Sequence, residues 1–419
     1  MWLSVLRMVG RFQRDIKGAI AIIFAASLFL IVLLIGMSVD YVRWQSNHSE
    51  AKSTLDAAVL AAGRIYQLPD TTDEDAIEAA YRYFDANRPK SLITDEETVN
   101  FSKQGLSFIG TVTAGRTKTP FLSLFGYESL PVTITSTATL EVSDLELSLM
   151  LDITGSMGEG SKLEDLKEAS KNLINIVLND EKFENTSKIA LVPFSTFVNV
   201  GETYFERVTG TTVPNGNDYT CVAERDTTDR YTDASPDVDN YFSHLKDYYP
   251  DIDDVCPTQS TIVPLTNDKT VLETNIDSFS IFRSSTAGHL ATAFAWYTLS
   301  PRWKHIWFPD EHEDEDNTDV ITTSDVRRIT VLMTDGRYNA QYSGDPSKDQ
   351  ALRLCENIKN EGIVVYAVGF DIPKGSSADE VMLECASSEG HYYNAANGEE
   401  LKAAYHDIAM KMFLLRVSK

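Results

Sequence analysis

The feature that most constrains this chain is an uncharged apolar run near its N-terminus. Residues 18–39 read GAIAIIFAASLFLIVLLIGMSV. About 20 apolar residues, at a helical rise of about 1.5 Å each, span a bilayer core of about 30 Å. A cleaved signal peptide has a shorter apolar core and ends in a small-residue cleavage site. The run therefore predicts a membrane-anchoring helix over residues 18–40 rather than a signal that is removed.

Charged residues on either side of the run predict its orientation. Four basic residues precede it: Arg7, Arg11, Arg14 and Lys17. Only Asp15 offsets them, and the other flank holds Asp40 and Arg43. The more basic flank of a span stays in the cytoplasm. We therefore expect residues 1–17 to be cytoplasmic and everything after residue 40 to be exported.

The segment after the run predicts a stalk and then a small β-rich unit. Residues 41–66 lack proline, and Leu55, Val59 and Ala62 recur at helical spacing, so the helix should continue past the lipid. This helix resembles a pilin stalk or an ordinary juxtamembrane stalk. Alternating Thr- and Val-rich runs after residue 98 are typical of strands. The predicted boundaries are 41–98 for the stalk and 99–143 for the β-rich spacer.

Net charge and cysteine content limit the partners and the compartment. The formal net charge is −25, and nucleic-acid binding needs clustered Lys and Arg, so no nucleic-acid partner is expected. The cysteines are Cys221, Cys256, Cys355 and Cys385. Export favours disulfides, and four cysteines allow three pairings. Closeness in sequence favours Cys221–Cys256 and Cys355–Cys385, whereas four buried thiols are the alternative.

From residue 144 onward, apolar strands alternate with helices. Four apolar runs, separated by helical patterns, predict strands: LELSLMLD, KIALVPFST, RRITVLMTDG and GIVVYAVGF. Strands that are apolar on both faces and connected by helices indicate a doubly wound, parallel α/β sheet, a Rossmann-like fold over residues 144–419. In such sheets ligands bind beyond the carboxyl ends of the strands. Asp152 and Asp335 lie at two of those ends.

Oxygen-bearing side chains from separate segments predict a cation site there. Asp152 is followed by the hydroxyls of Thr154 and Ser156, in a loop that we expect to be exposed. Such ligands suit Mg²⁺ or Ca²⁺ rather than zinc. The motif alone has a second interpretation, in which Asp152 and Ser156 cap the next helix. Asp335, together with Thr286 at the start of another helical pattern, favours the cation site.

These residues together resemble the metal-ion-dependent adhesion site (MIDAS) of von Willebrand factor A (vWA) domains. Such a site combines an Asp-x-Ser/Thr-x-Ser loop, a distant Thr and an Asp after a later strand. The resemblance assigns Asp152, Thr154 and Ser156 to the first loop, Thr286 (or, less well, Thr292) to the second and Asp335 to the third. It also implies a divalent cation, Mg²⁺ in preference to Ca²⁺, with a ligand position for an acidic group of a protein partner.

Five further stretches resemble the vWA-containing TadE/TadG-like proteins of tight-adherence (Flp) pilus assembly. They are RDIKGAIAIIFAASLFLIVLLIGMSVDYVR, TPFLSLFGYESLPVTITSTA, FAWYTLSP, VLMTDGRYN and the ending from GIVVYAVGF to ECAS. The resemblance implies a non-enzymatic, single-pass protein of the bacterial inner membrane, with its bulk in the periplasm. Its partners would be other pilus-assembly or envelope proteins. Prepilin peptidase cleavage after Gly18 is not expected, because the apolar run lacks the glutamate that such sites contain.

Two polar segments interrupt the vWA pattern. Residues 200–261 form an insertion rich in Asp, Thr and Tyr, which a Cys221–Cys256 bridge would staple near the metal-bearing edge. The acidic run at residues 310–319 lacks the spaced ligands of an EF-hand loop, and we interpret it as a solvated loop.

Two other functions compete with metal-dependent adhesion. The first is a purely structural, pseudopilin-like subunit in which the vWA fold is only a scaffold. The second is phosphoryl transfer, because the loop DITGS resembles the DKTGT loop of P-type pumps. Ile153 replaces the lysine of that loop, and the sequence contains no Gly-x-x-x-x-Gly-Lys phosphate loop, so phosphoryl transfer is disfavoured.

Overall fold

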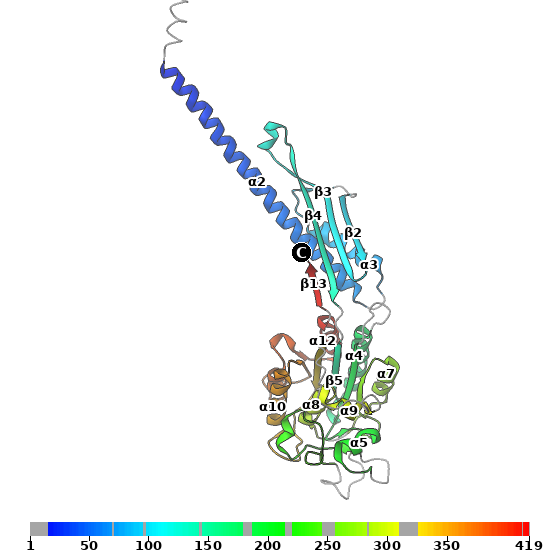
Figure 1. The fold of residues 1–419 in the computed structure, drawn as a ribbon. Coiled ribbons are helices and arrows are strands. Elements are labelled where there is room, and N and C mark those ends of the chain that lie inside the picture. The colour runs from blue at the N-terminus through cyan, green and yellow to red at the C-terminus, as the bar shows by residue number, and fades with distance from the viewer. Residues whose placement is uncertain are drawn as a thin grey trace, which may run out of the picture. The chain divides into compact units, whose positions relative to one another are not determined.

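The chain folds into two compact units, each with its own sheet (Figure 1). A computed structural model describes residues 16–68, 71–94, 98–141, 145–178, 187–213, 220–244, 256–282, 285–309, 326–412 and 414–418. The first unit comprises Met1–Glu141 together with Leu415–Lys419, and the second comprises Val142–Leu414.

The apolar run lies in one long helix, α2, which extends over Ile16–Tyr66. Its first half exposes large apolar side chains such as Phe29 and Leu34, as a helix in lipid would. Within the described part of the chain, α2 is the one helix long and apolar enough to cross a membrane. Its second half buries Leu55 and Val59 completely. The prediction that the helix continues past the apolar run is confirmed.

The second half of α2 packs against an antiparallel sheet and a short helix. The strands are β1 (Leu92–Ile93), β2 (Val99–Gln104), β3 (Ser107–Lys118) and β4 (Ser129–Glu141), with β3 paired to the other three. Helix α3 (Asp73–Asn87) begins with a capping box between Thr72 and Asp75. Phe84 of α3 and Phe108 of β3 are buried in the core of this unit. A 3₁₀ turn, η2 (Leu122–Phe125), forms the tip of the β3–β4 hairpin.

The last strand of the chain joins this first sheet. Strand β13 (Leu414–Ser418) lies beside β4, in the order β1-β3-β4-β13. The predicted boundaries place these residues in the vWA domain, whereas most of the strand belongs to the first unit. Without β13, β4 would be an open edge whose backbone groups lack partners within the sheet, which gives a physical reason for the return. Both ends of the second unit are therefore connected to one sheet.

The second unit contains an eight-stranded, mostly parallel sheet. Its strand order is β12-β11-β10-β5-β6-β7-β8, with β9 also paired to β6. The parallel strands are β5 (Leu145–Asp152), β6 (Lys188–Phe194), β10 (Arg327–Thr334), β11 (Val364–Phe370) and β12 (Tyr392–Ala395). The antiparallel additions are β7 (Val198–Asn199), β8 (Cys221–Val222) and β9 (Val263–Thr266). The predicted doubly wound α/β class is confirmed.

Helices cover both faces of this sheet. One face carries α4 (Lys162–Val177), α7 (Lys269–Ser278) and α12 (Gly398–Met412). The other carries α8 (Gly288–Tyr297), α10 (Ser347–Asn360) and α11 (Ser377–Cys385). Successive residues of β5 alternate between the two cores, since Leu149 and Leu151 join one and Met150 joins the other. Shorter helical elements are η3 (Gly155–Gly158), α5 (Glu202–Thr209), η4 (Thr228–Tyr231), η5 (Pro301–Trp303), α9 (Lys304–Trp307) and η7 (Glu389–His391).

The described part of the insertion belongs to the core of the second unit. Phe205, Val208 and Phe242 are buried in the same cluster as α8 and α10. Two disulfides are present, Cys221–Cys256 with a Cα–Cα distance of 5.7 Å and Cys355–Cys385 with one of 5.1 Å. This is the pairing that closeness in sequence favours. The acidic run at residues 310–319 lies outside the described residues.

Candidate metal centre

Strand β5 ends at Asp152, whose carboxylate the fold buries completely. Its Oδ1 accepts a hydrogen bond from the backbone N–H of Thr154 at 2.8 Å, and its Oδ2 accepts one from the hydroxyl of Thr334 at 2.7 Å. Thr334 ends the neighbouring parallel strand β10. The expectation that Asp152 is exposed is wrong, because β5 is an inner strand between β10 and β6 and its end is covered by theirs.

Asp152 and Ser156 do not cap helix α4. That helix begins at Lys162, its N-cap is Ser161, and no side chain caps it. The Ser156 hydroxyl instead donates to Asp335 Oδ1 at 2.5 Å and lies 3.1 Å from Thr154 Oγ1. Asp335 directly follows β10, so the first and third predicted loops are in direct contact. The capping interpretation is therefore wrong for α4.

Thr286 joins the same place from a third segment. Its backbone N–H donates to Asn339 Oδ1 at 2.8 Å, and its carbonyl accepts from the N–H groups of Asn339 and Ala340 at 3.0 and 3.1 Å. A Cβ atom on Gly336 would lie 3.7 Å from Ser156 Oγ and 4.0 Å from Thr286 Oγ1. Both hydroxyls therefore border the small space that this glycine leaves beside Asp335. The structure brings all three predicted loops together.

Thr292, the weaker second-loop candidate, lies elsewhere. It is fully buried inside α8, and its hydroxyl donates to the carbonyl of Gly288 at 2.8 Å. A side chain at Gly288 would overlap the ring of Tyr338, so only glycine lets α8 begin this close to the loop that follows Asp335. Thr286, just before α8, is the threonine whose hydroxyl borders the cluster.

Lys162 adds a positive charge to the cluster. No sequence pattern predicts this contact. Its ammonium lies 3.2 Å from Asp335 Oδ2 and 3.2 Å from Asp371 Oδ2. Asp371 follows β11 with a positive φ of 56°, a conformation that Asp tolerates better than most residues. Burial lowers the pKa of Lys162, but the two carboxylates outweigh burial and raise it. The lysine is therefore a fixed counter-ion of the acids at this edge.

The electrostatics of the cluster fit a bound cation. Burial, and secondly the charge of Asp335, raise the pKa of Asp152 to about 6. A divalent cation between the two carboxylates would stabilise both as anions. No described group of three or more His, Cys, Asp or Glu side chains could hold a metal, so a cation here would also need hydroxyl ligands. Carboxylate and hydroxyl oxygens are hard donors of the kind that Mg²⁺ and Ca²⁺ bind.

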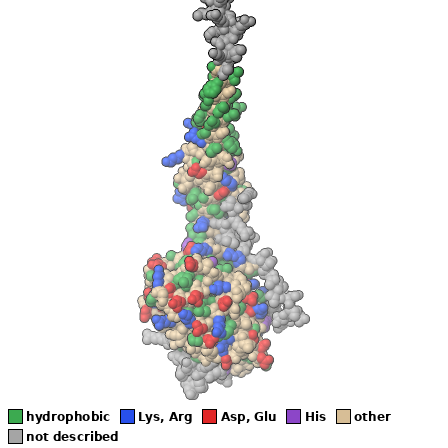
Figure 2. All heavy atoms as spheres, turned by 90° about the vertical axis from the view of Figure 1, so that its left-hand side faces the viewer, with side chains coloured by type: hydrophobic (Ala, Val, Ile, Leu, Met, Phe, Trp, Pro, Cys, Tyr) green, Lys and Arg blue, Asp and Glu red, His purple; other side chains and the backbone are tan. Residues whose placement is uncertain are grey.

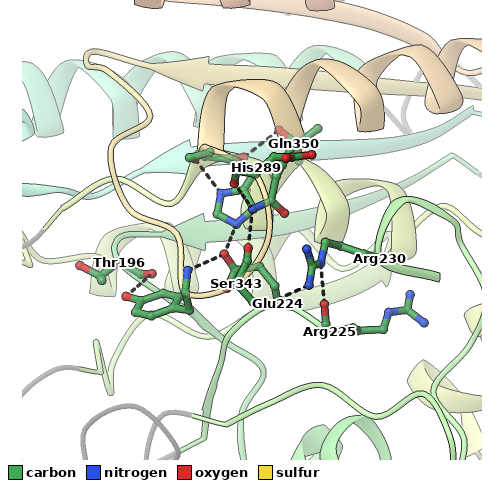
Figure 3. A network of polar contacts seen from close by, with 12 residues as sticks. Thr196, Glu224, Arg225, Arg230, His289, Ser343 and Gln350 are labelled. Carbon is green, nitrogen blue, oxygen red and sulfur yellow. Dashed lines mark hydrogen bonds and ion pairs between the residues drawn. The ribbon is translucent and has the colours of Figure 1, made fainter. Parts of the chain in front are cut away.

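A buried polar network connects the insertion to two of these loops (Figure 3). Glu224 Oε1 lies 2.7 Å from His289 Nε2 and accepts a hydrogen bond from the N–H of Tyr342 at 2.9 Å. Burial alone would raise the pKa of Glu224, but the bonds from His289 and Tyr342 outweigh it and lower that pKa. His289 follows Thr286 by three positions and Tyr342 follows Asp335 by seven. The insertion therefore helps to position the second and third loops.

Within the same network, a serine, an imidazole and a carboxylate form a chain of hydrogen-bond contacts. Ser347 Oγ lies 2.7 Å from His289 Nδ1, and His289 contacts Glu224. Such an order can activate a nucleophile, but Ser347 is only 1% exposed and no substrate can reach it in this conformation. Nearby, the Arg225 guanidinium stacks 4.6 Å above the Phe242 ring and Arg230 donates to the Arg225 carbonyl. No sequence pattern predicts this network, because its members are far apart along the chain.

The parallel sheet and the three loops that meet at its carboxyl edge define a vWA-type domain. Residues 311–407 match the von Willebrand factor type A domain family. Residues 18–64 match the Tad family, described as Flp pilus-assembly TadE/G-like. The chain thus combines a Tad-type N-terminal segment with a vWA domain, and the resemblance to TadE/TadG-like proteins with a vWA domain is confirmed.

Several solved structures are similar to parts of this chain, at low sequence identity and with low TM-scores. Proximal thread matrix protein 1 from the mussel byssus, with a zinc-occupied MIDAS motif, is 14% identical over 67% of this chain and 50% of its own, with a TM-score of 0.35. The match thus spans only about half of that protein. The pilus adhesin SpaC of Lactobacillus rhamnosus GG is 11% identical over 76% of this chain and 34% of its own (TM-score 0.40).

A third similar structure is the vWF domain of the type V pili tip protein Mfa5 from Porphyromonas gingivalis. It is 11% identical over 65% of this chain and 96% of its own, with a TM-score of 0.36. No curated protein matches the chain significantly.

Proposed function

We propose that this protein is a membrane-anchored, non-enzymatic component of a tight-adherence (Flp) pilus system that binds a protein partner through a divalent cation. The residues that would hold the cation are Asp152, Thr154, Ser156, Thr286 and Asp335. The cation would supply a Lewis-acidic position for an acidic side chain of the partner. Mg²⁺ is preferred over Ca²⁺ because the cluster offers few, compact donors rather than a cage of many carbonyls and bidentate carboxylates.

One observation supports this proposal most directly, the contact of three distant loops through oxygen atoms. The Ser156 hydroxyl bonds to Asp335, and Thr286 borders the same space beside Gly336. Two nearby acids, one of them fully buried, are costly unless a positive charge compensates them. Lys162 compensates only Asp335 and Asp371 directly. A cation beside Asp152 would compensate the charge of this acid as well.

The Tad-type segment supports the membrane and pilus parts of the proposal. It covers residues 18–64 and so includes the exposed apolar half of α2, whose orientation we infer from the basic residues that precede the run. We therefore place the protein in the bacterial inner membrane with its bulk in the periplasm. Its partners there would be other pilus-assembly or envelope proteins, and nucleic acid is not among them.

Metal binding is tested on the full chain in detergent, because the C-terminal strand belongs to the first unit. A ligand that binds only the folded state at about 100 times its Kd stabilises that state by about 2.7 kcal/mol. Mg²⁺ should therefore raise the Tm of the vWA transition by several degrees, and chelation should reverse this. Asp152→Asn keeps one oxygen that can accept from the Thr154 N–H, and its amide N–H can donate to the Thr334 hydroxyl. The substitution removes the charged ligand, so its Tm should not respond to Mg²⁺.

The matched control is Asp349→Asn, which removes an exposed acid from the first turn of α10 outside the cluster. This variant should respond to Mg²⁺ as the wild type does. Isothermal titration that detects no divalent cation on the wild-type chain would overturn the adhesion-site proposal in favour of the scaffold function. Partner capture from detergent extracts that is equal with and without chelator would also favour the scaffold function.

A further inference from the structure

The tip of the β3–β4 hairpin exposes an unusual concentration of apolar side chains. They belong to Phe121, Leu124, Phe125 and Tyr127, and we call them the apolar tip. Leu124 is 77% exposed, Tyr127 62% and Phe125 50%. Residues of these types are rarely this exposed side by side on a surface that meets only water, and such patches mark contact surfaces.

The apolar tip is fixed to α2 at the end of the apolar run. The Phe121 ring packs directly over Gly36, where any Cβ would overlap it. One turn further along α2, Asp40 Oδ2 accepts hydrogen bonds from the N–H groups of Phe121 and Leu122 at 2.8 and 2.7 Å. Asp40 is fully buried by this contact. The helix and the hairpin tip therefore form one surface within the first unit.

This attachment sets the depth of the tip relative to the run. Gly36 lies three residues before Val39, the last residue of the run, which is about 4.5 Å along a helix axis. Side chains at the level of Gly36 are thus about one turn inside the end of the predicted span. Interfacial apolar segments enter a bilayer by about 5–10 Å. The exposed tip lies at the depth where such side chains meet lipid.

Basic side chains gather immediately beyond the tip. A groove next to Pro120 is lined by Arg43, Lys90 and Lys118, which are exposed. An adjoining groove adds Arg116, together with the acid Glu128. Figure 2 shows blue basic side chains following the green apolar length of the first unit. This order, apolar and then basic, matches that of acyl chains followed by anionic headgroups.

We propose that the apolar tip is a second membrane contact. The tip inserts beside α2 into the leaflet that faces the folded units, while Arg43, Lys90 and Lys118 bind anionic lipid headgroups. This inference rests on the proposed anchoring by α2, whose apolar surface it continues. The contact would hold the stalk at a fixed angle to the bilayer, because one helix alone leaves that angle free.

The test uses the full chain in phosphatidylcholine vesicles that contain lipids with a nitroxide on the acyl chain. All four native cysteines are in disulfides, so a single added cysteine can carry a fluorophore. Leu124→Cys reports on the tip, Ser27→Cys reports on the span, and Gln104→Cys reports on an exposed position at the opposite end of the sheet. We expect strong quenching at positions 124 and 27 and none at position 104.

The outcomes separate the two proposals. Quenching at position 27 but not at 124 would overturn the tip contact and leave the anchoring intact. Absence of quenching at position 27 would overturn the anchoring, and the tip contact with it. A label at position 124 that is shielded from aqueous iodide yet untouched by the nitroxide would show that a protein or a second copy covers the tip, which also overturns the proposal.

The proposed binding of anionic headgroups by the basic residues has a separate test and control. Adding phosphatidylglycerol should increase the quenching at position 124, and Lys118→Glu should abolish this increase. Arg82→Glu changes an exposed basic residue on α3, away from the grooves, and should leave the increase unchanged. A tip label that responds equally to phosphatidylcholine with and without phosphatidylglycerol would refute the assignment of the basic residues to anionic lipid.

Discussion

Single residues at the metal centre show what the sequence could and could not reveal. The meeting of the five candidate ligands was predictable, because their loops follow apolar strands or precede a helix, and a parallel sheet brings such segments to one edge. The burial of Asp152 was not predictable, because it depends on Thr334 of a strand 182 positions away. The contact of Lys162 with the cluster was not predictable either, because a lysine at the start of a helix does not by itself indicate a site. Its role depends on two acids that only the fold brings near.

Lys162 should compete with the cation for Asp335. A unit charge about 5 Å from a divalent ion costs about 1.5 kcal/mol even in water-like screening. Lys162→Met should therefore strengthen Mg²⁺ binding by roughly tenfold in isothermal titration, a change of about 1.4 kcal/mol, while lowering stability without metal. Lys348→Met, which removes a half-buried partner of Glu380 outside the cluster, should leave cation affinity unchanged. Weaker Mg²⁺ binding by Lys162→Met would mean that the lysine supports the site instead.

At the scale of helices and strands, local patterns predicted the long elements and missed the short ones. The four apolar runs correspond to β5, β6, β10 and β11, because buried parallel strands must be apolar throughout. Strands β7, β8 and β9 are two to four residues long, and their pairing with β6 or with one another is set by the insertion. The short β13 carries equally little signal. Non-local pairing decides such elements, and one sequence does not show it.

The Cys355–Cys385 bridge should stabilise the pair of helices α10 and α11. It links the middle of α10 to the last residue of α11 and closes 30 positions of chain, for which loop entropy gives about 3–4 kcal/mol. The double variant Cys355→Ser, Cys385→Ser should lower the Tm of the vWA unit. Non-reducing peptide mapping of the wild type from the cell envelope should recover this pair. Four free thiols in exported protein would contradict the assignment.

On the scale of the whole molecule, the chain leaves the first unit once and returns to it. Strand β4 leads out of the first sheet and β13 completes that sheet beside β4. The vWA unit is thus an insertion between two adjacent strands, although the sequence reads as a linear series of domains. Composition could not predict this return of the chain, because a five-residue strand does not change the average composition of either unit. The long apolar helix, in contrast, was predictable from one uninterrupted run.

The orientation of that anchor is the broadest prediction, because the disulfides and the proposed envelope partners require the folded units to be exported. Alkaline phosphatase fused after residue 45 should be active, since it folds only outside the cytoplasm, and green fluorescent protein at the same point should be dark. Replacing Arg7, Arg11, Arg14 and Lys17 by Gln should weaken this bias, because those charges hold the N-terminus in the cytoplasm. The matched control, Lys52→Gln, lies beyond the apolar run on α2 and should not change the reporters. A fluorescent, phosphatase-negative wild-type fusion would place the vWA unit in the cytoplasm and remove the basis for its disulfides.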